Sequence, residues 1–172
     1  DLKDRYAFYT AQSYRDADMP EKAIEWYAKR ANLGGWYEEV YYSLLQIALL
    51  KIELNASLNE IQNLLLATYE YRPQRAESLY HLARQLRYHN KARLAYIYAT
   101  VAANIPLSKD ILFVDHAVYE WKAKEELAMS ANSVGNYQLC HDLCVELLFN
   151  PAVPEPNRKL LLDSLKLAKE HL

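Results

Sequence analysis

Apolar residues recur at helical spacing along the chain, and the clearest example is the stretch 75–105. Two consecutive runs, 79–86 and 94–105, place apolar residues three or four positions apart, which is the spacing of one face of an α-helix. The polar segment 89–91 separates the runs, and Pro106 ends the second because proline has no amide hydrogen to donate. The pattern predicts a helical hairpin. The small residues expected where its helices cross are Ala83, Ala95 and Ala102.

Similar patterns occur in three further stretches, at 5–33, 38–71 and 122–149. A single hairpin of this size cannot bury its apolar face alone, so the four hairpins are expected to stack on one another. Each stretch carries an alanine at an equivalent place in its first helix, and these alanines recur at intervals of 37, 35 and 45 positions. They are Ala11, Ala48, Ala83 and Ala128. The longest interval predicts an insertion, with a loop at 108–110 and a short apolar link at 111–114.

Local signals predict several helix ends. Pro20 is expected just inside the start of a helix, where its missing amide hydrogen is not needed, and Gly34-Gly35 at the end of that helix. Ser57 and Glu60 predict a helix start with a capping box. Four helix ranges follow from the apolar pattern: 3–17, 37–53, 115–133 and 157–171. The second of these is apolar on nearly every side, so it is expected inside the stack.

The first hairpin holds Ala-x2-Tyr at 11–14 and, after a turn, E-K-A-I-E-x-Y at 21–27, while the fourth holds Gly-Asn-Tyr at 135–137. These motifs resemble the tetratricopeptide pattern, whose period of about 34 residues is close to the first two alanine intervals. The resemblance implies an all-α fold, a tetratricopeptide-like right-handed superhelix of four degenerate helical hairpins plus a C-terminal capping helix. Residues 1–172 are expected to form it as a single domain.

Four longer strings have a second resemblance: RYAFYTAQSYRD, WYAKRANLGGWYEEVYY, YEYRPQRAESLYHLAR and ILFVDHAVYEW. They are similar to the helical-repeat region that follows the catalytic domain in some bacterial glycosyltransferases. The resemblance implies a nucleotide-sugar-using transferase domain upstream of this chain. Because the sequence starts at Asp1 rather than at methionine, we expect it to be a segment of a longer protein.

Composition and charge limit the class of protein, the kind of partner and the compartment that fit this sequence. Hydrophobic residues make up 52% and charged residues 24% of the 172 residues, which is typical of a globular protein. The net charge of −2 comes from well-mixed charges and argues against nucleic acid, which requires a basic stripe. No apolar run is long enough for a membrane span. The two cysteines are too few for a disulfide framework and favour the reducing cytoplasm.

No arrangement of residues predicts catalysis, a metal site or a cofactor. The five histidines form no HExxH motif. Asp115-His116 and Glu125-Glu126 are adjacent pairs that point to different sides of a helix, so they cannot act as a facing acid and base. Cys140 and Cys144 share a helix face, but no second pair supplies the other ligands of a zinc site. Both are expected in the core, and the chain is not expected to be an enzyme.

The first helix of each hairpin is expected to line a concave face that binds a ligand. The residues predicted to do so are Arg5, Gln12, Arg15, Tyr42, Tyr80, Arg84 and Arg87. Arginine, tyrosine and glutamine can hydrogen-bond to polar ligands and stack on them. In the alternative interpretation, the tyrosines fill gaps between helices; this set is Tyr6, Tyr9, Tyr27, Tyr42 and Tyr80. For Arg72, Arg75 and Glu77, an internal ion pair and an anion site both stay open.

These features predict a non-catalytic binding and scaffolding module with a protein or peptide partner. Two alternatives are a free-standing adaptor between proteins and a module that directly holds a glycan acceptor. A basic, aromatic groove would favour the glycan acceptor. A contiguous apolar patch on the convex side would favour the adaptor or a homodimer.

Overall fold

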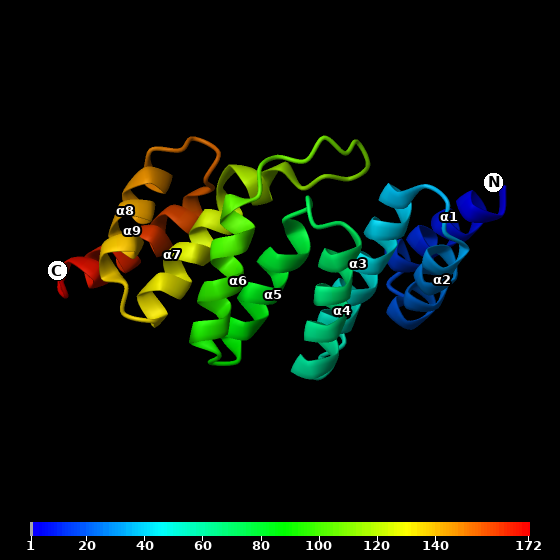
Figure 1. The fold of residues 1–172 in the computed structure, drawn as a ribbon, viewed down its shortest axis with the longest axis horizontal. Helices are drawn as coiled ribbons and strands as arrows, with labels where there is room; N and C mark the ends of the chain where they lie inside the picture. Colours follow the sequence, from blue (N-terminus) through cyan, green and yellow to red (C-terminus); the bar gives the residue numbers. More distant parts are fainter. Residues whose placement is uncertain (1) are drawn as a thin grey trace. The chain divides into compact units, whose positions relative to one another are not determined.

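The computed structural model describes residues 2–172, and every regular element in that range is a helix (Figure 1). The all-α class predicted from the apolar pattern is confirmed. The described chain divides into two compact units. Unit 1 is the chain up to Pro73 together with Ser108–Val114, and unit 2 is Gln74–Leu107 together with Asp115–Leu172.

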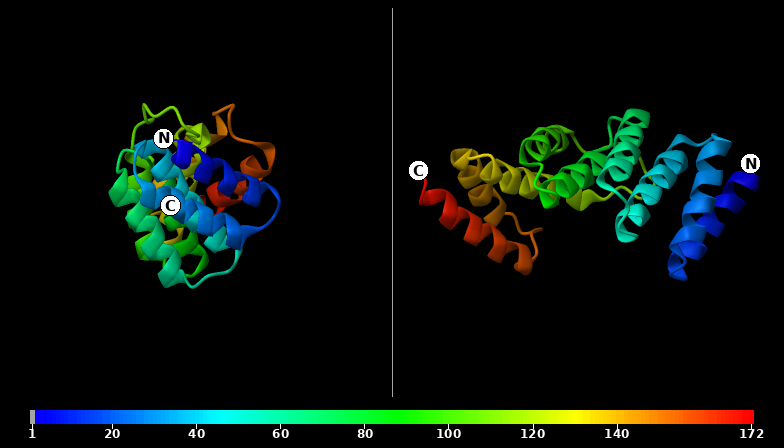
Figure 2. Two further views of the ribbon diagram at one scale, coloured as in Figure 1. Left: turned by 90° about the vertical axis from the view of Figure 1, so that its right-hand side faces the viewer. Right: turned by 90° about the horizontal axis from the view of Figure 1, so that it is seen from below.

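Unit 1 consists of two helical hairpins and the short segment 108–114. In the first hairpin α1 (Leu2–Asp16) packs on α2 (Pro20–Leu33), and in the second α3 (Tyr37–Glu53) packs on α4 (Leu58–Tyr71). The contact between α2 and α3 joins the two hairpins, as Figure 2 shows in the blue and cyan helices. The predicted ranges 3–17 and 37–53 lie within a residue of the observed helices.

The predicted helix ends in unit 1 are confirmed, with one exception. Pro20 is the first residue of α2, and Gly34 and Gly35 end it with φ angles of 68° and 79°. The Ser57 hydroxyl accepts a hydrogen bond from the N–H of Glu60 at 3.2 Å. The reciprocal half of the capping box is not formed, because the Glu60 carboxylate pairs instead with Lys51 at 2.7 Å.

The core of unit 1 lies between its two hairpins. Its buried cluster draws on α1, α2 and α3 and consists of Phe8, Ala11, Ala23, Tyr27, Tyr42, Ile47 and Leu50. Helix α3 has ten buried residues, more than any other described helix, as its apolar pattern predicts. Burying apolar surface on several sides of one helix is what holds the hairpins together.

The segment 108–114 follows α6 in sequence but belongs to unit 1. A carboxylate oxygen of Glu38 accepts hydrogen bonds from the N–H groups of Ile111 and Leu112, at 2.8 Å and 2.7 Å. Phe113 packs its ring on Tyr42, with the ring centroids 4.8 Å apart. The predicted loop and apolar link is therefore an ordered strap tied to α3.

Unit 2 contains the remaining helices: α5 (Glu77–Tyr88), α6 (Ala92–Asn104), the π turn η1 (Val118–Lys122), α7 (Ala123–Ser133), α8 (Tyr137–Leu148) and α9 (Glu155–Lys169). Asp115 caps the start of the predicted 115–133 helix, since its carboxylate accepts from the N–H of Ala117 at 3.1 Å. The sequence did not predict the π turn within that range. The last helix starts at Glu155 rather than at 157, because Pro156 fits the first turn, where no amide donor is needed.

Small residues lie at the helix crossings of unit 2, as predicted. Ala83, Ala95 and Ala102 are buried, and Ala83 packs in a cluster with Ala99 and Leu127. Cys140 and Cys144 are buried free thiols within the cluster formed by α7, α8 and α9. The interpretation of both cysteines as core residues is confirmed.

Of the two interpretations of the arginine cluster, the internal ion pair is the one that forms. Arg75 and Glu77 pair at 2.7 Å, and both side chains are almost fully buried. The Tyr119 hydroxyl donates to Glu77 at 2.9 Å and accepts from the N–H of Ala76 at 3.1 Å. Arg72 lies in unit 1, where it pairs with Asp110 and stacks on the Tyr37 ring. Both arginines are therefore bound to carboxylates of their own unit rather than forming an open anion site.

Candidate interaction surface

Helix α5 places tyrosine and arginine side chains along one of its sides. Tyr80, Arg84 and Tyr88 are four residues apart, so successive turns of the helix bring them into register. Tyr80 is buried, whereas Arg84 and Tyr88 are exposed. We call Tyr80, Arg84, Arg87 and Tyr88 the α5 strip. It contains three of the residues predicted from the sequence.

Arg84 is held in place by tyrosine rather than by a carboxylate. Its Nε donates to the Tyr88 hydroxyl at 3.1 Å, and its guanidinium carbon lies 5.4 Å from the centre of that ring. Among residues 2–172 it forms no ion pair. Most of its hydrogen-bond donors are therefore available to an incoming acceptor.

Arg87, by contrast, is committed to an internal partner. Its Nε and Nη2 donate to the two carboxylate oxygens of Glu126 on α7, at 2.7 Å and 2.9 Å. This fork raises the pKa of Arg87 and leaves Glu126 almost fully buried. Arg87 also lies 4.9 Å from the centre of the Tyr88 ring. The main role of Arg87 is therefore to fix the position of the α5 strip, because two of its nitrogens already donate to Glu126.

Two further titratable groups lie beside the strip. Burial, together with the positive charges of Arg84 and Lys122, lowers the pKa of His81 to about 4, so its ring is neutral at pH 7. Burial raises the pKa of Glu125, which accepts a hydrogen bond from the Asn157 amide of α9 at 2.8 Å. The sequence analysis did not include Tyr88, although its spacing of four residues from Arg84 indicates a contact. No spacing or motif in the sequence indicates the contact of Asn157 with Glu125.

The predicted residues in unit 1 have different surroundings. Arg15 donates to the Tyr42 hydroxyl at 2.7 Å and pairs with Asp16 at 2.9 Å. Tyr42 is buried against Phe8 and Tyr27. The structure thus brings Arg15 and Tyr42 together in an internal contact.

Arg5 and Gln12 do not join that contact. Gln12 is half-buried on α1, while Arg5 lines a groove between α1 and α2. The gap-filling interpretation of the tyrosines holds for Tyr27, Tyr42 and Tyr80, which are buried. It is wrong for Tyr6 and Tyr9, which are 66% and 62% exposed because they project from the side of α1 that α3 does not cover.

Metal-holding clusters and membrane-spanning helices are both absent from the part of the chain that the structure describes. No group of three or more histidine, cysteine, aspartate or glutamate side chains within residues 2–172 could hold a metal ion. In the same range, every helix is too short or too polar to cross a membrane. What the α5 strip offers is hydrogen-bond donors, a positive charge and an aromatic ring on a rigid helix.

Packed helical hairpins with alanines at their crossings define a tetratricopeptide-like helical-repeat fold, and the comparison with solved structures agrees. One similar structure is MamA 41-end from Desulfovibrio magneticus RS-1. The alignment covers 99% of this chain and 92% of the MamA chain, with a TM-score of 0.70 and 15% identity. A MamA RS-1 double mutant, ArsTM, matches 99% over 91% of its chain, with a TM-score of 0.71 and 14% identity.

A third match is a putative kinesin light chain of Podosopora anserina with nearly identical TPR-like repeats. It covers 97% of this chain and 85% of its own, with a TM-score of 0.63 and 16% identity. Searches with protein-family models and against curated proteins find no match. At these levels of identity the likeness establishes the fold.

Proposed function

We propose that this chain is a non-catalytic protein-interaction module, and that its α5 strip binds an acidic group of a protein or peptide partner. Helical-repeat folds present rigid, extended surfaces suited to such binding. Arginine binds carboxylates through paired hydrogen bonds, and an adjacent aromatic ring adds a stacking surface. A partner with an exposed aspartate, glutamate or C-terminal carboxylate has the matching chemistry.

The observation that carries the proposal is that Arg84 is exposed and has no carboxylate partner among the described residues. Three other arginines of unit 2 bind carboxylates or backbone carbonyls of the unit: Arg75, Arg87 and Arg158. Arg84 instead binds a neutral hydroxyl and stays exposed. An exposed cation whose orientation is already set by a neighbouring ring loses less entropy on binding than a free side chain does.

The test is a binding screen with fluorescein-labelled decapeptides that differ in acidic content, each made with a free and an amidated C-terminus. Arg84→Ala should weaken binding of the best acidic peptide by roughly 1–3 kcal/mol, the worth of a hydrogen bond between charged groups. Arg93→Ala is the matched control, since Arg93 is exposed on α6 and lies outside the strip. Equal binding by wild type and Arg84→Ala, or equal losses in both variants, would refute the proposal.

The resemblance to the helical region of bacterial glycosyltransferases supports a second candidate, in which the module holds a glycan acceptor beside a transferase domain. The exposed ring of Tyr88, next to two guanidinium groups, favours it because sugars stack on such rings and hydrogen-bond to arginine. Titration with neutral and acidic oligosaccharides tests this candidate. It fails if Tyr88→Ala binds each oligosaccharide as well as the wild type does.

We place this module in the cytoplasm, where the buried thiols of Cys140 and Cys144 stay reduced. We also propose that it acts in one of two ways: as an adaptor joining separate proteins, or as the recognition region of a larger enzyme. Sedimentation of the purified chain at several concentrations tests the remaining alternative, a homodimer formed through an exposed apolar surface.

A further inference from the structure

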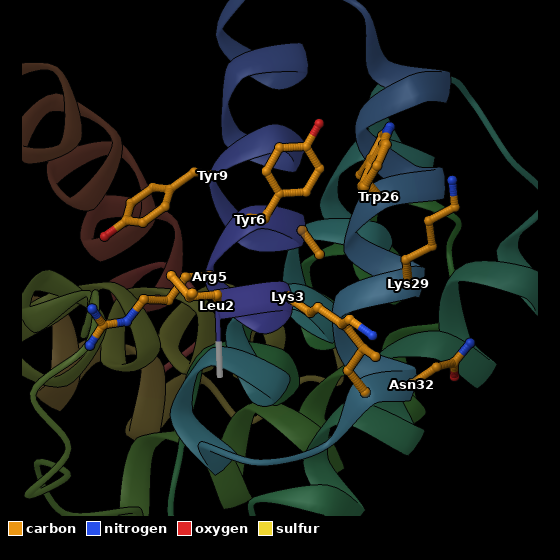
Figure 3. Close-up of a pocket in the computed structure, with 10 residues that line it drawn as sticks. Leu2, Lys3, Arg5, Tyr6, Tyr9, Trp26, Lys29 and Asn32 are labelled. Carbon is orange, nitrogen blue, oxygen red and sulfur yellow. The ribbon is translucent and has the colours of Figure 1, made fainter.

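The face of the first hairpin that points away from α3 carries an apolar groove of about 940 Å³ (Figure 3). Leu2, Tyr6 and Tyr9 line it from α1, and Trp26 and Leu33 line it from α2. Tyr6 and Trp26 meet edge to face across it, with their ring centroids 5.7 Å apart. The contact between these two rings means that the groove is preformed in the absence of a partner.

This hairpin is apolar on two sides. On the side that faces α3, Phe8, Ala11 and Tyr27 are almost completely buried. On the other side, Leu2 and Tyr6 are 85% and 66% exposed. An isolated exposed apolar residue needs no explanation, but a contiguous patch over two helices marks an interaction site.

The charges around the groove select the partner. All the ionisable side chains that line it, apart from the tyrosines, are cations: Lys3, Arg5 and Lys29. Lys29 lies 4.1 Å above the centre of the Trp26 ring and also pairs with Glu25 at 2.7 Å. An apolar floor with a basic rim complements an apolar stripe flanked by carboxylates.

We infer that this groove binds an acidic amphipathic α-helix of a partner protein. A groove between two helices accepts the side-chain ridge of a third helix, which packs through residues at i, i+3, i+4 and i+7. The lining residues of α1 extend over roughly two helical turns, so a helix of at least that length would fill the groove. Aspartate or glutamate beside the stripe would lie near Arg5 and Lys29.

Two other occupants fit the groove less well. A second copy of this chain docking through the same face would bring the two basic rims together, because such an interface is self-complementary. An anionic bilayer would meet the cations, but it presents a flat surface and would leave the space between the helices unfilled. The proposed site lies in unit 1 and is independent of the α5 strip.

The probe is a fluorescein-labelled peptide of about fifteen residues, roughly four helical turns, with leucines at i, i+3, i+4 and i+7 and glutamates beside them. A matched peptide has lysines in place of the glutamates. We expect the acidic peptide to bind at least tenfold more tightly than the basic one to the full chain, with an affinity that falls as salt is added.

Variants locate the site. Tyr6→Ser should weaken binding of the acidic peptide about tenfold or more, as expected for an aromatic anchor, and Arg5→Glu should also weaken it. Tyr71→Ser on α4 and Lys22→Glu on α2 are the matched controls, since both residues are exposed and outside the groove. A loss of affinity in Arg84→Ala but not in Tyr6→Ser would instead locate the peptide at the α5 strip, which separates this inference from the proposed function.

Three results would overturn the inference. The first is equal affinity for the acidic and basic peptides. The second is unchanged affinity in Tyr6→Ser, which is expected to fold because its side chain is exposed. The third is a different occupant: self-association that Tyr6→Ser abolishes, or co-sedimentation with phosphatidylserine vesicles in place of peptide binding.

Discussion

Arg87 on α5 and Glu126 on α7 are joined at two points, Nε to Oε1 at 2.7 Å and Nη2 to Oε2 at 2.9 Å. The two residues are 39 positions apart in the sequence. The pair fixes the spacing of two helices and also orients the guanidinium against the Tyr88 ring. Arg84, one turn away on α5, therefore points outward from a braced surface.

Removing Arg87 should therefore lower stability. In Arg87→Ala the Glu126 carboxylate keeps its buried position but loses its charged partner, so we expect the free energy of unfolding to fall by about 2–4 kcal/mol. Urea denaturation followed by circular dichroism measures it. Arg93→Ala, an exposed arginine on α6, should change it by less than about 0.5 kcal/mol. Equal effects in both variants would mean that the ion pair contributes nothing.

Enlarging a residue at a helix crossing should force the helices apart. Ala83 is fully buried in contact with Ala99 and Leu127, so Ala83→Leu should lower the free energy of unfolding by roughly 1–3 kcal/mol. Ala67→Leu makes the same change at an exposed position of α4 and should be close to neutral. Identical midpoints of thermal unfolding for Ala83→Leu and the wild type would contradict a helix crossing at Ala83.

Glu38 should control the order of the 108–114 strap. Its carboxylate accepts from two successive backbone N–H groups, so Glu38→Ala leaves both donors without their partner. Hydrogen exchange at the amides of Ile111 and Leu112 should then accelerate by about tenfold or more, while exchange in α8 stays unchanged. Glu38→Gln retains one acceptor oxygen and should show a smaller effect. Slow exchange in Glu38→Ala would show that other contacts hold the strap.

The state of His81 predicts a dependence of stability on pH. Its pKa falls from 6.5 to about 4 on folding, so the unfolded chain binds more protons between these values than the folded chain does. Its contribution to stability is therefore complete above about pH 6.5 and is lost as the pH falls toward 4. The difference in unfolding free energy between wild type and His81→Gln should shrink over this window. A pKa of His81 near 6.5, measured by NMR titration, would contradict this account.

Much of the fold was predictable because its signals are local. The Ser57 cap, the Gly34-Gly35 helix end and the helix start at Pro20 each depend on residues a few positions apart, and all three are present. Ala83 could be assigned to a crossing from spacing and size alone. Such features follow from backbone geometry and short-range hydrogen bonding, which can be predicted from the types of neighbouring residues.

The candidate surface depended on partners that lie far apart in the chain. By sequence, Arg84 and Arg87 are equivalent members of one helix face, and only Glu126, brought close by the packing of α7 on α5, separates their roles. Tyr6 and Tyr27 are both helical tyrosines of the first hairpin, yet α3 covers one and leaves the other exposed. Short-range patterns in the sequence were enough to predict the helices and their small-residue crossings. Which arginines are neutralised and which aromatic rings face solvent follows from tertiary packing, because burial and pairing depend on neighbours distant in sequence.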